Sequence, residues 1–378
     1  MTVRGTHLVV DLERITENAR NVKEVCAARG VEVLGVTKGV SAEEHIVSAV
    51  LAGGITKLAD ARLENVRRLR RSGFRQPITL LRIPMLSQAE QVTAICDCSL
   101  NSEPEALKAL SDAALAAGKT HEVILMIDVG DLREGVFPED AAGLLRCALP
   151  LKGIRVVGIG TNMGCYGGIL PTENNLTLLC EVARELERAA GEPLEIISGG
   201  GTSSLMLTAE GKMPEGVNQI RVGEGILLGT DSTFARSIPW LNQDTFILRA
   251  EIVELKRKPT VPIGERGAPV FSDAPVFEDQ GLRRRAIVAL GQQDVPPGGI
   301  IPCDPAIRVL GASSDHTILD IEDSERNYSL GDMVDFRLNY QGMLMACSSA
   351  YIPHVYLCGE KEMDEQILTL EEAAEIRE

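Results

Sequence analysis

The first two-thirds of the chain alternates between short apolar runs and amphipathic segments. A helical pattern over 13–29 is followed by apolar runs at 31–38, 55–61, 77–83, 95–100, 122–130, 154–162, 194–200 and 218–225. Short apolar runs separated by helices are typical of parallel βαβ units. Eight such units close a barrel of about 250 residues. We therefore expect an α/β fold that begins with a (β/α)8 TIM-type barrel, with a doubly wound open sheet as the alternative.

The pattern changes near residue 240. From there the sequence predicts strands without helices, at 246–258, 283–291, 317–323, 332–339, 342–349 and 353–357. Turn-forming stretches such as PPGG at 296–299 separate them. The sequence thus predicts a barrel domain over 1–240 and a mainly β C-terminal domain over 241–378. Residues 368–378 are expected to form a short helix or a frayed tail.

Charge and cysteine usage narrow the functional classes. The net charge is −16 without a long basic run, which makes nucleic acid and anionic membranes poor partners. The densest basic stretch, RRLRRSG at 67–73, is typical of a solvated helix face. No apolar run is long enough to span a bilayer, and the N-terminus lacks the apolar core of a signal peptide. The nine cysteines are scattered, so we expect a cytoplasmic protein with reduced thiols and no bound metal.

Polar residues gather at the predicted strand ends, where active sites of such barrels lie. The first run, VEVLGVTK, is apolar until it ends at Lys38. A strand that simply reaches the surface would explain one lysine, but the other strand ends are polar too. They carry Asp60, Arg62, Arg82, Asp128, Asp131, Arg133, Thr161, Asn162, Arg221 and Glu224.

Two glycine-rich turns follow the last two barrel runs, SGGGTSS at 198–204 and RVGEG at 221–225. A flexible loop is one interpretation of such text. Their position favours another, because phosphate sites in barrels lie preferentially after strands seven and eight. In the first turn, glycines such as Gly201 let the backbone approach a ligand closely, and the hydroxyls of Thr202, Ser203 and Ser204 add donors for an anion. A phosphate site that faces a nucleophilic lysine suggests pyridoxal 5'-phosphate (PLP).

With the motifs VTKG, MIDVGDLREG, SGGGTSS and IRVGEG, the chain resembles the fold-type III PLP enzymes of the alanine racemase family over nearly its whole length. The resemblance implies that Lys38 carries the cofactor and that Arg221 faces its pyridine nitrogen. It further implies that the two glycine-rich turns bind the phosphate, through Gly201, Thr202, Ser203, Gly223 and Glu224. It also implies that Arg133 contacts the cofactor phenolate and the substrate carboxylate. Asn162 completes the expected cofactor set. Met126 stands where the family motif has a lysine.

One departure concerns the proton-transfer group on the opposite face of the substrate. The family supplies a tyrosine across a dimer interface, from a Gly-Tyr-x-Asp-Gly motif. Here the matching text is GQQDV, with Gln292 in the place of the tyrosine, and glutamine exchanges no proton near neutral pH. The candidates in the C-terminal domain are Asp294, Asp315, His316, Tyr351 and His354, of which we take Tyr351, His316 and Asp315 as the catalytic set. A homodimer with shared active sites is expected.

GQQDV and GASSDH resemble the ornithine racemase-like branch of the family. We therefore expect a racemase that interconverts L- and D-amino acids by two-base proton transfer at Cα, with ornithine or lysine as substrate. Arg133, Asp294 and Asp315 are the expected substrate-binding residues. The alternatives are an alanine or serine racemase, a PLP-dependent D-amino-acid lyase or aldolase, and a non-catalytic PLP-binding protein. A lyase would need a metal, for which Cys303, His316, His354 and Cys358 are the available ligands.

Overall fold

The computed structural model describes residues 5–267, 277–358 and 361–364. The chain divides into two compact units. One comprises Arg14–Gln243, and the other combines Met1–Glu13 with Asp244–Glu378. Residues 5–13, which the sequence analysis placed with the barrel, therefore lie in the second unit. The tail predicted at 368–378 lies outside the described residues.

The first unit is a closed barrel of eight parallel strands. Six of the strands fall within a predicted apolar run, and β5 and β6 each extend one residue beyond theirs, to Asn101 and from His121. The barrel closes where β9 pairs with β2, with Arg221 opposite Leu34. The predicted barrel is confirmed, and the open sheet is excluded. The strands are β2 (Glu32–Val36), β3 (Lys57–Asp60), β4 (Ile78–Leu80), β5 (Cys98–Asn101), β6 (His121–Met126), β7 (Ile154–Gly160), β8 (Ile196–Ser198) and β9 (Gln219–Val222).

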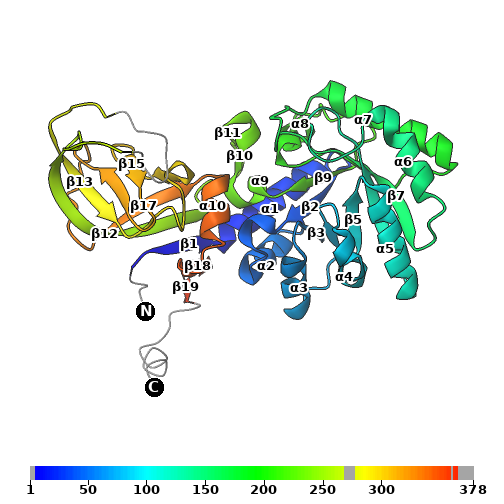
Figure 1. The fold of residues 1–378 in the computed structure, drawn as a ribbon, viewed down its shortest axis with the longest axis horizontal. Helices are drawn as coiled ribbons and strands as arrows, with labels where there is room; N and C mark the ends of the chain where they lie inside the picture. The colour runs from blue at the N-terminus through cyan, green and yellow to red at the C-terminus, as the bar shows by residue number, and fades with distance from the viewer. Residues whose placement is uncertain (1–4, 268–276, 359–360, 365–378) are drawn as a thin grey trace, which may run out of the picture. The chain divides into compact units, whose positions relative to one another are not determined.

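Helices connect these strands and cover them on the outside (Figure 1). A large apolar cluster joins helix and strand side chains, and a smaller one of Cys98, Leu100, Ile124, Met126 and Val157 comes from strands alone. Alternating side chains on each strand thus fill two layers, one under the helices and one inside the barrel. The helices are α1 (Leu12–Ala27), α2 (Glu44–Ala52), α3 (Leu63–Arg71), α4 (Ala89–Ile95), α5 (Pro104–Ala116), α6 (Ala141–Ala148), α7 (Glu173–Ala190), α8 (Leu205–Ala209) and α9 (Glu224–Leu228).

The second unit is built on a nine-stranded sheet, which confirms the mainly β prediction. The N-terminal strand β1 lies between β12, to which it is antiparallel, and β18, to which it is parallel. The long strand β12 also pairs with β13 and β17. The strands are β1 (His7–Asp11), β12 (Phe246–Pro259), β13 (Leu282–Val288), β14 (Ile300–Pro302), β15 (Arg308–Ala312), β16 (Thr317–Asp320), β17 (Met333–Leu338), β18 (His354–Cys358) and β19 (Lys361–Asp364).

The strand predicted at 342–349 is wrong, because this segment forms helix α10 (Tyr340–Ala346). The Asn339 side chain caps the helix by accepting a 2.9 Å hydrogen bond from the N–H of Gly342. Met343 and Ala346 lie three residues apart on the same face and are buried. A short run of methionine, leucine and alanine has good helix propensity, and the cap decides the conformation. Within the described part of the chain, no helix has the length and apolar character needed to cross a membrane.

Candidate active site

Lys38 begins a short 3-10 turn directly after β2. Its side chain is half-buried and makes no hydrogen bond or ion pair within the described residues. Burial lowers the pKa of Lys38, the Arg133 and Arg221 guanidinium groups lower it further, and Cys165 and Asp60 act in the opposite direction. The structure therefore presents an amine that is unpaired and easier to deprotonate than an ordinary lysine, as a nucleophile or base requires.

Asp60, at the end of β3, is fully buried and holds the turn that carries Lys38. Its carboxylate accepts hydrogen bonds from the Thr37 hydroxyl at 2.6 Å, the Arg62 N–H at 2.8 Å and the Asn65 amide at 3.0 Å. Burial raises the pKa of Asp60, and these hydrogen bonds oppose the rise. Asp60 thus fixes the residue before Lys38 to the neighbouring strand.

Arg221, on β9, is a buried cation with neutral partners. Its side chain donates from Nη1 to Ser198 Oγ at 2.5 Å and from Nη2 to the Thr161 carbonyl at 2.6 Å. Burial lowers the pKa of Arg221 to about 10. The hydroxyl of Thr161 is also buried and has no partner within the described residues. A buried guanidinium without a carboxylate has donors left for a ligand.

Arg133 follows β6 on the loop over 127–136. It donates from Nε and Nη2 to both carboxylate oxygens of Glu134. With the Asn162 amide oriented to satisfy both neighbours, its oxygen accepts from Arg133 Nη2 and from the Met163 N–H, each at 3.2 Å. Burial alone would lower the pKa of Arg133, but the hydrogen bonds and charge of Glu134 prevail, so the pKa is raised. The sequence analysis had named Arg133 and Asn162 as candidates but had not considered Glu134.

The two glycine-rich turns meet beside Arg221. The Thr202 hydroxyl accepts a hydrogen bond from the Gly225 N–H at 3.2 Å, which joins the turns. A Cβ on Gly201 would lie 3.3 Å from the Arg221 carbonyl, and one on Gly223 would lie 3.1 Å from Val36 Cβ. Both turns lead into short helices, whose first N–H groups have no acceptor in the helix. The turns therefore form a tight cradle of backbone donors.

This donor set fits PLP. Lys38, Arg133 and Arg221 form a cluster of three cations at the C-terminal end of the barrel, and of these three only Arg133 has a carboxylate partner among the described residues. An anion with further acceptor atoms would balance the two remaining charges and the backbone cradle. The residues that would hold it are those predicted from the sequence, namely Lys38, Arg133, Asn162, Gly201, Thr202, Ser203, Arg221, Gly223 and Glu224.

Cys165 is a second residue that sequence reasoning missed. It is exposed, and its thiol interacts electrostatically with Lys38, Arg133 and Arg221. Its loop is held by Asp131, whose carboxylate accepts from the backbone N–H groups of Gly164, Tyr166 and Ile169. The glycine-rich segment GCYGG at 164–168, which follows the sixth apolar run, could have indicated a loop at the site, but no role was predicted for it.

The remaining acids at the strand ends hold loops. Asp128 accepts from the N–H groups of Gly130 at 2.8 Å and Leu132 at 3.2 Å. Glu224 accepts from the hydroxyls of Thr230 at 2.7 Å and Ser232 at 2.6 Å. With Asp60 and Asp131, these carboxylates are already hydrogen-bonded, so their number alone says little about the charge of the substrate.

In the second unit, hydrogen bonds bring together three segments that carry the other candidates. Gln292 Nε2 donates to the Ala312 carbonyl at 2.9 Å, which gives this side chain a structural role. Ser349 Oγ donates to Asp294 at 2.8 Å and accepts from the Tyr351 N–H at 3.2 Å. The loop over 291–295 also bonds to the hairpin turn that carries Asp315 and His316. All four candidates, Asp294, Asp315, His316 and Tyr351, therefore lie on connected segments.

The other residues considered for this unit are placed differently. His354 lies in β18, half-buried, with Nδ1 3.2 Å from the hydroxyl of Tyr356. Cys303 follows β14, and Cys358 ends β18. Within the described residues, no group of three or more His, Cys, Asp and Glu side chains is arranged to hold a metal ion.

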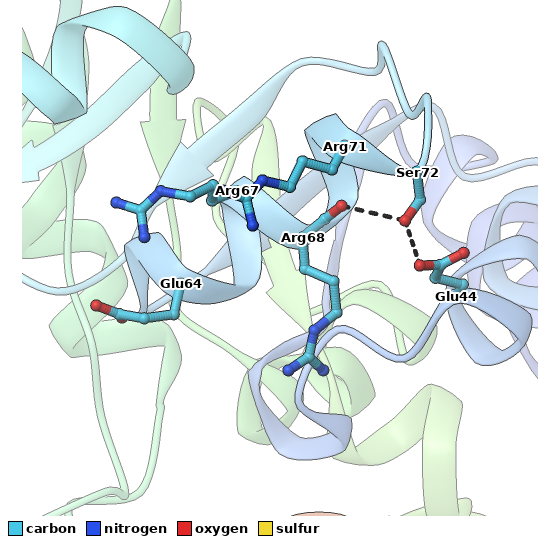
Figure 2. A pocket seen from close by; sticks show the side chains of 6 residues that line it. All are labelled: Glu44, Glu64, Arg67, Arg68, Arg71 and Ser72. Atoms are coloured by element: carbon cyan, nitrogen blue, oxygen red, sulfur yellow. Dashed lines mark hydrogen bonds between the residues drawn. The ribbon is translucent and has the colours of Figure 1, made fainter. Parts of the chain in front are cut away.

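A pocket of about 400 Å³ lies between α2 and α3 (Figure 2). Figure 2 shows the Ser72 hydroxyl between the Glu44 carboxylate and the Arg68 carbonyl, and its single hydrogen can be donated to either oxygen. Arg68 donates to the Ser41 carbonyl at 2.7 Å, and Arg67 donates to Gln91 at 2.9 Å. The basic stretch is thus a helix face whose arginines bond to neighbouring segments of the protein, and none of the predicted site residues lines this pocket.

Comparisons with known proteins agree with this geometry. The chain matches the family described as alanine racemase, N-terminal domain, over residues 10–231. It is 42% identical over 350 residues to the lysine racemase of Thermotoga maritima, which covers 92% of this chain and 98% of that protein. It is 41% identical over 346 residues to the ornithine racemase of Acetoanaerobium sticklandii, covering 91% and 98%. The alanine racemase of Streptomyces lavendulae shares the fold, with a TM-score of 0.74, 19% identity, and coverage of 95% and 98%.

Proposed function

Because this chain belongs to the alanine racemase family, we propose that it is a PLP-dependent amino-acid racemase that acts on ornithine and lysine. The family resemblance found in the sequence is confirmed. One observation carries the proposal. Lys38, unpaired and with a lowered pKa, lies within electrostatic reach of Arg133 and Arg221 at the barrel end that also bears the glycine-rich cradle.

PLP, when bound, would acidify the Cα–H of an amino acid by withdrawing electron density. Lys38 would hold it covalently and carry the proton on one face of Cα, for which its lowered pKa is suited. Arg221 would donate to the pyridine nitrogen, and the turns at Gly201–Ser203 and Gly223–Glu224 would bind the phosphate. Arg133 would orient the substrate carboxylate.

The opposite face of Cα needs a second proton carrier, which we assign to Tyr351 of a partner subunit in a homodimer. Its side chain is 71% exposed in the single chain, and its backbone is tied through Ser349 to Asp294. Asp315 and His316 are exposed on the adjoining hairpin turn and are the alternatives. Asp294 and Asp315 are the proposed partners of a distal ammonium group.

The test is a comparison of kcat/KM for L-ornithine, L-lysine, L-alanine and L-serine with one preparation, with enantiomers resolved by chromatography. Ornithine and lysine should exceed alanine, because a desolvated charge pair discriminates strongly. Higher kcat/KM values for alanine or serine would show that the protein is an alanine or serine racemase. A bound metal and loss of amino acid without D-product would identify a lyase instead.

We also propose a cytoplasmic location, because all nine cysteines are free thiols.

A further inference from the structure

The Arg133–Glu134 pair is built on a closed loop. Asp128 N–H donates to the Val136 carbonyl at 2.8 Å, and Val136 N–H donates to the Met126 carbonyl at 3.0 Å. A Cβ on Gly135 would lie 2.6 Å from the Asp128 nitrogen, and Gly135 has a φ of +127° that disfavours other residues. The loop is therefore closed at its base directly after Glu134, which limits the positions that Glu134 can take.

Glu134 and Asn162 together use three of the five N–H groups of Arg133. Nε–H and one Nη2–H bond to Glu134, and Nη2 also donates to Asn162. Five hydrogens in a planar fork leave the two on Nη1, for which the described residues offer no acceptor. Met126, the last residue of β6, is fully buried in the apolar cluster inside the barrel and has no charged group that could hold Arg133.

We propose that Glu134 is a positioning residue of the active site, which fixes the Arg133 guanidinium so that only its Nη1 edge faces the substrate carboxylate. This inference rests on the proposed function. Glu134 also neutralises the Arg133 charge, and its side chain is 17% exposed against 36% for Arg133, so water reaches the pair mainly from the arginine side. A guanidinium held on one edge by a carboxylate has lost much of its orientational freedom before the substrate binds, which lowers the entropic cost of binding.

The first test uses the apoprotein and needs no activity. Phenylglyoxal modifies accessible, unpaired arginines, and mass spectrometry of peptides reports the rate at Arg133. Glu134→Gln should speed the modification of Arg133 by about tenfold, since a charge-assisted pair is lost. Glu195→Gln is the matched control. Glu195 lies directly before β8 and pairs with Arg155 of β7. The Glu195→Gln change removes this carboxylate from Arg155 and should leave the rate of Arg133 modification unchanged.

The second test separates positioning from general structure. In Glu134→Gln, KM for ornithine should rise about tenfold while kcat changes less, and Glu134→Asp should recover part of the loss. In an Arg133→Lys background, which has no fork to position, the same Glu134→Gln change should alter KM by less than about twofold.

Two results would overturn the proposal. One is an unchanged Arg133 modification rate in a Glu134→Gln apoprotein that melts at the wild-type temperature. The other is a tenfold KM effect of equal size in both Arg133 backgrounds, which would mean that Glu134 acts on something else. If the wild-type protein does not racemise amino acids, the proposed function fails, yet the labelling test still decides the role of Glu134.

Discussion

The Thr37 hydroxyl donates a 2.6 Å hydrogen bond to the buried Asp60 carboxylate, so the residue before Lys38 is tied to the end of the neighbouring strand. The two residues lie at the ends of β2 and β3, which pair in parallel with Val36 opposite Ala59. The position of Lys38 therefore depends on a contact between strands as well as on its own turn.

Thr37→Val should destabilise the fold by about 1–3 kcal/mol, because Asp60 loses a donor while remaining buried. Urea unfolding at neutral pH measures the change. Thr93→Val is a matched control, since the buried Thr93 hydroxyl donates to the Glu90 carbonyl of its own helix and has no other partner among the described residues. Equal stability of the two variants would contradict a special role for the Thr37–Asp60 contact.

Lys38 should be the lysine that PLP labels. Borohydride reduction of the protein with PLP, followed by peptide mapping, should place the pyridoxyl group on Lys38, because its amine is unpaired and its pKa is lowered. Lys57 provides an internal comparison, since it is paired with Glu32 at 2.9 Å and should remain unlabelled. A pyridoxyl group mainly on another lysine would refute the assignment.

Much of the barrel and of its site could be predicted from the sequence. Apolar runs of strand length locate the strands, and parallel strands in a barrel bring Lys38, Arg133 and Arg221 to one end. Pairings between distant segments carry no local signal, which is why β1 was not expected beside β12 and β18. Helix α10 was missed because its short apolar run has no clear period, and its cap is visible only in the structure. Glu134 was missed because the sequence does not show whether the side chain next to an arginine turns towards the guanidinium or away from it.

The buried His121 should make the barrel sensitive to mild acid. Its Nε2 lies 2.9 Å from Ser99 Oγ, and burial lowers the pKa of His121 from 6.5 to about 4. The folded state therefore disfavours the protonated ring, and the unfolded chain binds the proton more readily. The stabilisation is complete above about pH 6.5 and falls as the pH drops towards 4, by up to about 3 kcal/mol.

The measurement is the free energy of unfolding at pH 7.5 and pH 5 for the wild-type protein and His121→Gln. The wild-type protein should lose more stability between these two pH values than the variant, which has no titrating ring at this position. Equal losses in both proteins would show that His121 does not govern the acid sensitivity.

Alkylation of Cys165 should block cofactor labelling. The thiol is exposed and interacts with Lys38, Arg133 and Arg221, so a carboxamidomethyl group would occupy space beside the cofactor lysine. Iodoacetamide treatment should reduce pyridoxyl labelling of Lys38 in the wild-type protein but not in Cys165→Ala. The exposed Cys147 on α6 gives the control, because its alkylation in the Cys165→Ala protein should have no effect. Equal loss of labelling in both proteins would exclude Cys165 from the site.

Complementation between two inactive variants should reveal a shared active site. If Lys38 and Tyr351 act from different subunits, a dimer of Lys38→Ala with Tyr351→Phe contains one site with both residues intact and one site with neither. Random pairing puts half of the subunits into such mixed dimers, so co-expression should restore roughly a quarter of the wild-type specific activity. If both residues act within one subunit, every site in the mixture lacks one of them and no activity returns. Asp315→Asn and His316→Gln in place of Tyr351→Phe extend the assay to the alternative proton carriers, and recovery with one of them but not with Tyr351→Phe would move the assignment to that residue.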